Sequence, residues 1–288
     1  MRLIFTDLDG SLLDHHSYSF APAVPLLAEL EALDVPVIPI TSKTYAELVT
    51  LRDALNNRHP FIVENGAAIY IPSRYFKTQP EHATLENDFW VLRNVPRRAK
   101  WQQLLTERVA DFSGEFETFD SVYAASGAAG VADITGLAPN AAELANQREH
   151  SEPVHWIGSP QRKLTFIYRL KEAGATVLQG GRFINIGGDV DKGRAMLQLR
   201  DLYLAEANLQ NRGQQDSNNH CEILAIGDSN NDVAMLELAS SALVIRADDR
   251  APPILKRTEN CYISQQTGPD GWVEGVNLWL QKTDKNKH

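Results

Sequence analysis

The sequence predicts an α/β protein in which a Rossmann-like, doubly wound parallel sheet carries an inserted α+β domain. Two observations indicate this fold. Short apolar runs alternate with segments of helical periodicity at both ends of the chain, which is typical of a parallel sheet with crossover helices. The middle of the chain, from about residue 83 to residue 188, is rich in aromatic residues, arginine and small residues and lacks this alternation.

The first part of the chain supplies strands and helices in turn. Residues 2 to 6 form an apolar run that ends abruptly, as a buried parallel strand does. Apolar residues at helical spacing predict a helix over residues 22 to 33. VPVIPI, residues 35 to 40, predicts a second strand, although its two prolines are unusual for a central one. A helix over residues 44 to 55 and a hairpin over residues 59 to 71 follow.

The last part of the chain repeats the alternation. EILAIGD, residues 222 to 228, predicts a strand, and residues 231 to 239 predict the helix that follows it. Further strands are expected at residues 241 to 245 and 261 to 264, and a closing helix at residues 271 to 282. The two ends of the chain therefore contribute to one sheet.

The middle of the chain is interpreted as a separate insertion. KLTFIYRL, residues 163 to 170, and GRFINIG, residues 181 to 187, predict two of its strands. The predicted domains are a first core part at residues 1–82, an inserted α+β domain at residues 83–188 and a second core part at residues 189–288.

Composition narrows the class of function. The chain has 288 residues, of which 43% are hydrophobic and 23% charged, with a formal net charge of −9. This charge argues against nucleic acid or an anionic membrane as a partner, and an anionic substrate would need a locally positive site or a metal ion. No apolar run predicts a membrane span or a signal peptide, and Cys221 and Cys261 lack metal-ligand spacing. The expected location is cytoplasmic.

Four short polar segments stand where a predicted strand ends or a helix begins. They are Asp7-Leu8-Asp9-Gly10-Ser11, Thr41-Ser42-Lys43-Thr44, Asp191-Lys192-Gly193 and Gly227-Asp228-Ser229-Asn230-Asn231-Asp232. Ligands of open α/β sheets bind outside the carboxyl ends of the strands. We therefore expect the four segments to converge on one crevice with several carboxylates, two lysines, hydroxyl groups and helix N-termini.

This set of groups fits phosphoryl transfer. Asp7 and Asp9 stand so close in the chain that their carboxylates would repel each other unless a cation or a proton in transit lay between them. An aspartate can attack phosphorus, and a second carboxylate can protonate the leaving oxygen and then activate water. Mg²⁺ would offset the repulsion between nucleophile and substrate, while lysine, hydroxyl and N–H donors hold the phosphate oxygens.

The order of these motifs, DxDGS, SK, DKG and GDSNND, resembles the haloacid dehalogenase (HAD) superfamily of phosphatases. The insertion between the second and third motifs is similar to that of the subclass with a large C2-type cap. Further segments resemble those of mannosyl-3-phosphoglycerate phosphatases, namely LLDHHSYSF, PITSKT, VENGA, QREHSEP, GGRF and GPDGW. The resemblance extends from Asp7 to Trp272 and implies Mg²⁺-dependent hydrolysis of mannosyl-3-phosphoglycerate or its glucosyl analogue.

The resemblance also implies roles for the motif residues. Asp7 matches the nucleophile and Asp9 the general acid/base, while Ser42 and Lys192 match the phosphate-binding residues. The positions that match metal-binding residues are Asp7, Asp9 (through its backbone carbonyl), Asp228, Asn231 and Asp232.

Weaker candidates are expected to contact the rest of the substrate. They are Lys43, Asn65, Arg148, Glu149 and Arg182. Arg148 and Glu149 could bind sugar hydroxyls or the glycerate carboxylate, or could form an ordinary surface ion pair, and Asn65 could be only a turn residue. The resemblance implies that His15 and His16 belong to a flap beside the active site. The GGRF segment continues with Ile184-Asn185, where this family is expected to have a histidine or another polar residue, and this departure bears on substrate preference.

Two other functions stay open at this point. One is another sugar-phosphate enzyme on the same scaffold, such as a sucrose-phosphate phosphatase or a phosphomannomutase. The other is a non-catalytic phospho-acceptor or binding module, against which Asp9 and the large insertion argue. The expected partner is a small phosphorylated sugar-glycerate, and the sequence does not indicate an oligomeric state.

Overall fold

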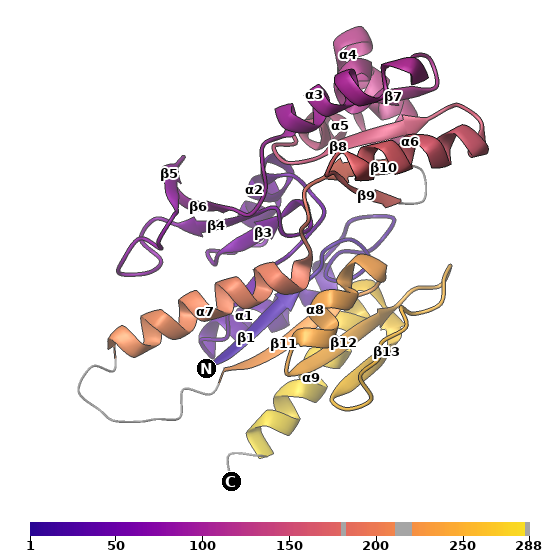
Figure 1. Cartoon of the computed structure of the whole chain (residues 1–288). Helices are drawn as coiled ribbons and strands as arrows, with labels where there is room; N and C mark the ends of the chain where they lie inside the picture. The colour runs from indigo at the N-terminus through magenta and orange to yellow at the C-terminus, as the bar shows by residue number, and fades with distance from the viewer. Residues whose placement is uncertain (180–182, 211–220, 286–288) are drawn as a thin grey trace. The chain divides into compact units, whose positions relative to one another are not determined.

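The computed structural model of the chain describes residues 1–179, 183–210 and 221–285 (Figure 1). These residues fold into two compact units. The first unit is formed by Met1–Thr41, Leu55–Leu92 and Asp191–His288. The second unit is formed by Ser42–Ala54 and Arg93–Val190.

A five-stranded parallel sheet forms the centre of the first unit. Its strands, in order, are β13 (Cys261–Thr267), β12 (Ser241–Arg246), β11 (Glu222–Gly227), β1 (Arg2–Thr6) and β2 (Val37–Pro39). Phe5 of β1 lies opposite Ala225 of β11 on one side and Ile38 of β2 on the other. The prolines of β2 are compatible with its place as the last strand of the five. The predicted parallel α/β sheet is confirmed.

Helices cover both faces of this sheet (Figure 1). On the face that carries Leu3 and Phe5 lie α7 (Lys192–Gln210) and α8 (Val233–Leu238). On the other face, α9 (Gly268–Lys285) packs against β12 and β13, and α1 (Val24–Ala32) follows a short 3₁₀ helix that contacts α9. The chain runs from β1 to β2 in one direction and from β11 to β13 in the other, so the strand order switches between β1 and β11.

The first unit also contains an antiparallel sheet. Its strands, in order, are β3 (Phe61–Val63), β4 (Ala68–Pro72), β6 (Phe89–Arg93) and β5 (Thr84–Glu86). The predicted turn at Asn65-Gly66 joins β3 to β4. Residues 83 to 92 therefore lie in the first unit, whereas α2 (Tyr45–Ala54) lies in the second. The division into core and inserted domain at residues 82/83 and 188/189 stays a prediction.

The second unit is built on another antiparallel sheet. Its strands, in order, are β7 (Phe116–Thr118), β8 (Glu152–Trp156), β10 (Phe183–Gly187) and β9 (Thr176–Gln179). Its other helices are α3 (Arg98–Arg108), α4 (Phe119–Thr135), α5 (Pro139–Asn146) and α6 (Pro160–Glu172). Trp101 of α3 and Phe166 of α6 pack with Ile184 of β10 in one hydrophobic core. Phe119 of α4 packs on Phe183 from the other side of β10.

One predicted strand is wrong. Residues 163 to 170 belong to helix α6. Pro160 occupies the start of this helix, and the side chain of Ser159 accepts a hydrogen bond from the backbone N–H of Arg162, as a helix N-cap does. Phe166, Ile167 and Leu170 are all buried, and a helix places these three positions on one face, whereas a strand would point the neighbours Phe166 and Ile167 to opposite faces.

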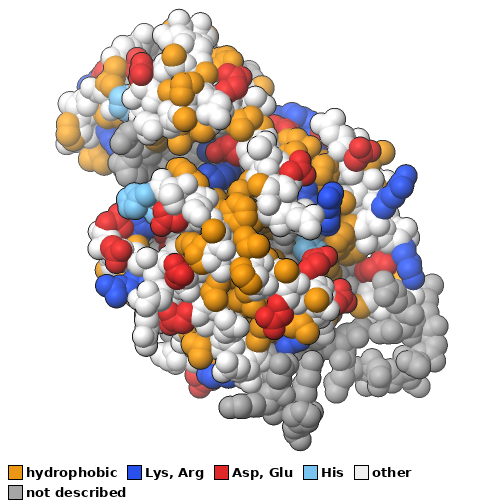
Figure 2. Space-filling view, turned by 180° about the vertical axis from the view of Figure 1, so that it is seen from behind, with side chains coloured by type: hydrophobic (Ala, Val, Ile, Leu, Met, Phe, Trp, Pro, Cys, Tyr) orange, Lys and Arg blue, Asp and Glu red, His pale blue; other side chains and the backbone are white. Residues whose placement is uncertain are grey.

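The surface shows a mixed distribution of charge. Figure 2 shows one face of the molecule, on which acidic and basic side chains are interspersed among polar and hydrophobic ones. Within the described ranges, none of the helices combines the length and the hydropathy that crossing a membrane requires.

Candidate active site

Asp7 is fixed at the carboxyl end of β1, where the strand order switches. Its backbone N–H donates to the carbonyl of Ile226 at 2.8 Å, which continues the pairing of β1 with β11. The hydroxyl of Thr6 donates to the carbonyl of Asp7 at 2.7 Å, and the indole Nε1 of Trp272 donates to the same hydroxyl at 3.1 Å. These bonds position a carboxylate that is only 6% exposed at the place where ligands of such sheets bind.

A tight turn follows Asp7. Gly10 has φ +79°, a conformation that favours glycine, and its N–H donates to the carbonyl of Leu13 at 2.9 Å. A β-carbon at this position would lie 2.7 Å from Oδ2 of Asp228. Glycine therefore allows the turn that carries Asp9 to approach the end of β11 closely.

Lys192 joins two of the predicted aspartates. It is fully buried at the start of α7, and its Nζ lies 2.6 Å from Oδ1 of Asp7 and 2.7 Å from Oδ1 of Asp232. Burial lowers the pKa of Lys192, but the carboxylates of Asp232 and Asp7 outweigh this effect and hold the pKa above its ordinary value. The lysine is therefore a permanent positive charge in this cluster.

The start of α7 depends on a second glycine. Gly66 has φ +104°, and a β-carbon there would lie 2.6 Å from the carbonyl oxygen of Asp191. Neighbouring Asn65 accepts a hydrogen bond through Oδ1 from Nδ2 of Asn231 at 3.1 Å. The turn between β3 and β4 thus supports both the lysine-bearing helix and the loop after β11.

The loop after β11 is closed by Asp232. Oδ2 of Asp232 accepts hydrogen bonds from the backbone N–H groups of Asp228 and Ser229, both at 3.0 Å. Its other oxygen pairs with Lys192, so Asp232 holds the loop and the lysine together. Asp228, which is 2% exposed, forms an ion pair with Arg250 from the loop after β12.

The charges of this cluster shift two carboxyl groups. Burial raises the pKa of Asp7 to about 8. The attraction of Lys192 lowers this pKa, but repulsion from Asp232 and Asp9 opposes that attraction. Burial and repulsion from Asp232 also raise the pKa of Asp228, against the attraction of Arg250. Burial and the repulsion between neighbouring carboxylates therefore disfavour the ionised forms of Asp7 and Asp228 in the protein alone.

These residues fit a divalent metal ion. Carboxylate oxygens of Asp7, Asp228 and Asp232 lie within 4.8 Å of one another, and all three residues are buried. Mg²⁺ prefers oxygen ligands, and its charge would offset the repulsion that raises the pKa of Asp7. Because both oxygens of Asp232 are already bonded, Asp7 and Asp228 are the better placed ligands.

Other predicted residues belong to the second unit. Ser42 and Lys43 follow Thr41 directly but belong to the second unit, where Nζ of Lys43 lies 3.8 Å from Oε1 of Glu47. The guanidinium of Arg148 donates to Oγ of Ser151 at 3.1 Å and to the carbonyl of Ser42 at 3.3 Å.

Glu149 forms ion pairs with two arginines of the second unit. Its carboxylate lies 3.5 Å from Arg93 and 3.3 Å from Arg97. An ion pair of this kind is the alternative to substrate binding that the sequence left open. Arg182 lies outside the described residues. The substrate roles of these residues stay predictions.

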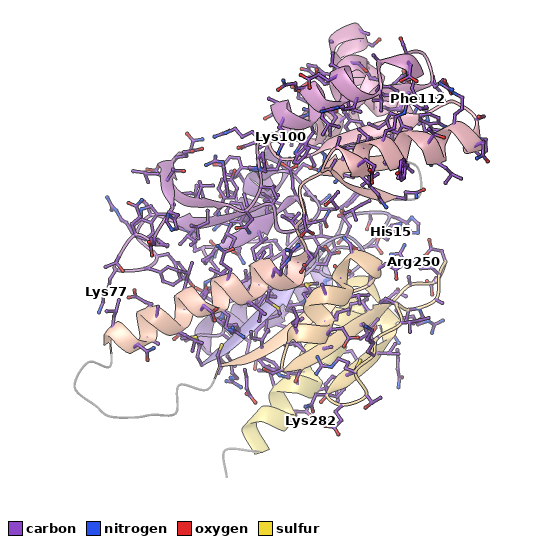
Figure 3. All side chains as sticks on the ribbon, viewed as in Figure 1. His15, Lys77, Lys100, Phe112, Arg250 and Lys282 are labelled. Atoms are coloured by element: carbon purple, nitrogen blue, oxygen red, sulfur yellow. The ribbon has the colours of Figure 1, made fainter. Side chains whose placement is uncertain are left out.

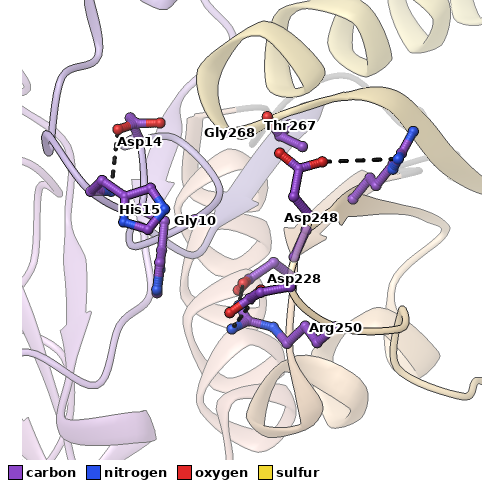
Figure 4. Close-up of a pocket in the computed structure, with 12 residues that line it drawn as sticks. Gly10, Asp14, His15, Asp228, Asp248, Arg250, Thr267 and Gly268 are labelled. Atoms are coloured by element: carbon purple, nitrogen blue, oxygen red, sulfur yellow. Dashed lines mark hydrogen bonds and ion pairs between the residues drawn. The ribbon is translucent and has the colours of Figure 1, made fainter.

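Sequence reasoning missed three residues of this site, Thr6, Trp272 and Arg250. A signal for Arg250 was available, because RADDR, residues 246 to 250, directly follows a predicted strand at the same edge of the sheet as Asp7 and Asp228. Figure 3 shows Arg250 and His15 on the same side of the first unit, and both line one cavity (Figure 4).

Solved structures share this fold. A phosphatase of the HAD superfamily from Bacteroides thetaiotaomicron has a TM-score of 0.63 at 15% identity, with 96% of this chain and 94% of that chain covered. A HAD subclass IIB sugar phosphatase has a TM-score of 0.59 at 13% identity, covering 97% and 99%. The sucrose-phosphatase of Synechocystis sp. PCC6803 has a TM-score of 0.57 at 16% identity, covering 96% and 97%. The fold is that of the HAD superfamily.

The sequence comparisons define the family further. No family model matches the chain. A curated relative, the glucosyl-3-phosphoglycerate/mannosyl-3-phosphoglycerate phosphatase of Methanococcoides burtonii, is 32% identical over 276 residues, covering 96% of each chain. The chain belongs to the family of this enzyme and is a phosphoric monoester hydrolase of the HAD superfamily. The predicted resemblance and enzyme class are confirmed.

Proposed function

We propose that this protein hydrolyses the phosphomonoester of mannosyl-3-phosphoglycerate or glucosyl-3-phosphoglycerate, with Mg²⁺ as cofactor. The observation that carries the chemistry is the buried cluster at the switch point, where Lys192 joins Asp7 to Asp232 beside Asp228. The observation that carries the substrate class is the relative from Methanococcoides burtonii, whose alignment includes nearly the whole chain.

In the proposed reaction, Asp7 is the nucleophile. One of its carboxylate oxygens attacks phosphorus, the bond from phosphorus to the ester oxygen breaks, and Asp9 donates a proton to that leaving oxygen. Asp9 then takes a proton from water, which attacks the aspartyl-phosphate and releases inorganic phosphate and free Asp7. Support comes from the bond of Lys192 to Oδ1 of Asp7, which orients the side chain and leaves Oδ2 free of that lysine.

The positive groups have separate proposed tasks. Lys192 favours the ionised form of Asp7, and it is close enough to Asp7 to hold a phosphate oxygen as charge develops. Mg²⁺, held by Asp7, the backbone carbonyl of Asp9 and Asp228, would reduce the repulsion between the nucleophile and the phosphate dianion. Asp232 and Asn231 would orient this set through the loop after β11.

The substrate contacts remain predictions. We propose Ser42 for phosphate and Lys43, Asn65, Arg148, Glu149 and Arg182 for the glycosyl-glycerate part. Among the described candidates, Arg148 has the planar fork that suits a carboxylate, and its bond to the carbonyl of Ser42 connects it to the second motif. A cytoplasmic location and a small-molecule partner are also kept as predictions.

The test is phosphate release from a panel of substrates. The panel holds mannosyl-3-phosphoglycerate, glucosyl-3-phosphoglycerate, sucrose phosphate and mannose 1-phosphate, each with Mg²⁺ and with a chelator. We expect the two glycosyl-phosphoglycerates to have the highest kcat/KM and all release to stop with the chelator. Preference for sucrose phosphate would contradict the proposed substrate, and unchanged release with the chelator would contradict the metal.

A further inference from the structure

Lys192 and Arg250 pair with buried aspartates of the candidate active site, and the two cations differ in exposure. Lys192 is fully buried and contacts Asp7 and Asp232, so it has no route to water. Arg250 contacts Asp228 from the loop after β12, and its side chain is 37% exposed. Because Asp228 is only 2% exposed, the arginine can leave this pair for water, whereas the carboxylate cannot follow it.

Arg250 reaches the carboxylate through a cavity. Gly10, His15 and His16 line it from the segment after β1, and Asp248, Asp249 and Arg250 line it from the loop after β12 (Figure 4). Its guanidinium also lies 3.8 Å from Oδ1 of Asp249. A β-carbon at Gly10 would lie 2.7 Å from Oδ2 of Asp228 and 3.7 Å from Nη2 of Arg250, so glycine keeps open the space in which the pair forms.

A metal ion would need the same carboxylate. Oxygens of Asp7, Asp228 and Asp232 converge within 4.8 Å, and Arg250 pairs with Asp228 through Oδ2. A guanidinium and a divalent cation at one carboxylate repel each other, and the guanidinium occupies Oδ2, one of the two oxygens that Asp228 offers a metal.

We propose that Arg250 is the exchangeable counter-cation of Asp228 and that Arg250 and a divalent metal ion exclude each other at this carboxylate. Arg250 is then a positioning residue that sets the metal affinity. It satisfies the buried carboxylate before the metal binds and moves out into the cavity when the metal arrives. This inference rests on the proposed metal site of the phosphatase.

The test is a calorimetric titration of Mg²⁺ alone into the metal-free, full-length protein. Arg250→Gln removes the guanidinium from Asp228. Arg246→Gln is the matched control, because Arg246 lines the same cavity and pairs with Asp248 at 3.9 Å rather than with Asp228. We expect Arg250→Gln to bind Mg²⁺ about tenfold more tightly than the parent, as the loss of one competing charge-assisted hydrogen bond implies, and Arg246→Gln to bind as the parent does.

Thermal unfolding supplies a second readout. With a chelator, Arg250→Gln should unfold at a lower temperature than the parent, because Asp228 loses its counter-cation, and Mg²⁺ should close this difference. Equal or weaker Mg²⁺ binding by Arg250→Gln overturns the inference, as does an equal gain in Arg246→Gln.

Asp228→Asn separates this inference from the proposed function. If Asp228→Asn binds Mg²⁺ as tightly as the parent, the proposed metal site is wrong and the inference falls with it. If Asp228→Asn loses Mg²⁺ binding while Arg250→Gln leaves it unchanged, only the inference is overturned.

Discussion

The two units hold their candidate functional residues in different ways. In the first unit, Asp7, Lys192 and Asp232 are at most 6% exposed and are bonded to one another. In the second unit, Arg148 is partly exposed and bonds to a hydroxyl and a backbone carbonyl, while Glu149 pairs with two arginines.

This difference matches two kinds of task. Fixed, desolvated charges are needed where a bond to phosphorus is made and broken, because water would weaken them. Residues that recognise the rest of a substrate must instead have donors that a ligand can reach. The comparison therefore predicts that changes in the first unit abolish chemistry or stability, whereas changes in the second alter substrate preference.

The largest effect is expected for Asp7→Asn. An amide of nearly the same volume cannot attack phosphorus, so kcat should fall at least about 10³-fold. Steady-state phosphate release measures this, and circular dichroism checks that the fold is kept. A variant that keeps more than a tenth of the parent rate would show that Asp7 is not the nucleophile.

Lys192→Met should be the most destabilising change. It leaves the buried carboxylates of Asp7 and Asp232 without their lysine, which should lower the free energy of unfolding by about 3 kcal/mol at neutral pH. Urea unfolding with a chelator measures it. Lys282→Met, which removes an exposed lysine that contacts Tyr262, is the control and should change the free energy by less than about 0.5 kcal/mol. Equal effects of the two variants would contradict the account.

A smaller effect links metal binding to pH. Because the pKa of Asp7 is raised to about 8 without metal, Mg²⁺ binding at pH 7 should release nearly one proton. Calorimetry in buffers of different ionisation enthalpy measures this release, and Asp7→Asn should abolish it. The apparent Mg²⁺ affinity should rise about tenfold per pH unit up to pH 8. An affinity that does not change with pH would contradict the raised pKa.

The same shift predicts how stability depends on pH. An unfolded aspartate has a pKa near 4, whereas the pKa of Asp7 in the metal-free folded protein is about 8. Between pH 4 and pH 8 the unfolded state therefore binds fewer protons at this position, so the contribution of Asp7 to the stability of the metal-free protein falls as pH rises. Urea unfolding of the parent and Asp7→Asn at pH 5 and pH 8 measures this contribution. The prediction is wrong if the difference in free energy of unfolding between the two proteins is the same at both pH values.

The smallest effect is expected in the second unit. Arg148→Lys loses the planar fork but keeps the charge, so KM for the preferred glycosyl-phosphoglycerate should rise about tenfold while hydrolysis of an aryl phosphate stays unchanged. Arg169→Lys, which alters an exposed ion pair with Asp111 in the same unit, is the control. Equal losses on both substrates would show that Arg148 supports the fold rather than recognition.

The sequence predicted the core better than the second unit, for physical reasons. Buried parallel strands are continuous apolar runs that end at polar residues, so their ends, and with them Asp7 and Asp228, could be located from the pattern alone. KLTFIYRL is a segment whose length suits either a strand or a helix. Ser159 and Pro160 before it are a signal for the start of a helix, and the strand prediction did not take this signal into account.

Contacts between distant segments were not predictable in the same way. The bond from Trp272 to Thr6 joins residues 266 positions apart in the chain, and the pair of Arg250 with Asp228 depends on a loop with no periodicity. Such contacts follow from how helices and loops pack, which local pattern does not contain.

The most direct test of the central claim is whether Asp7 becomes phosphorylated. We would mix Asp9→Asn with an aryl phosphate, whose leaving oxygen needs no acid, then quench in acid and locate the phosphoryl group by peptide mass spectrometry. The account predicts a phosphorylated peptide that contains Asp7, which accumulates because Asp9 is absent to activate water. Release of phosphate with no phosphorylated Asp7 would contradict it.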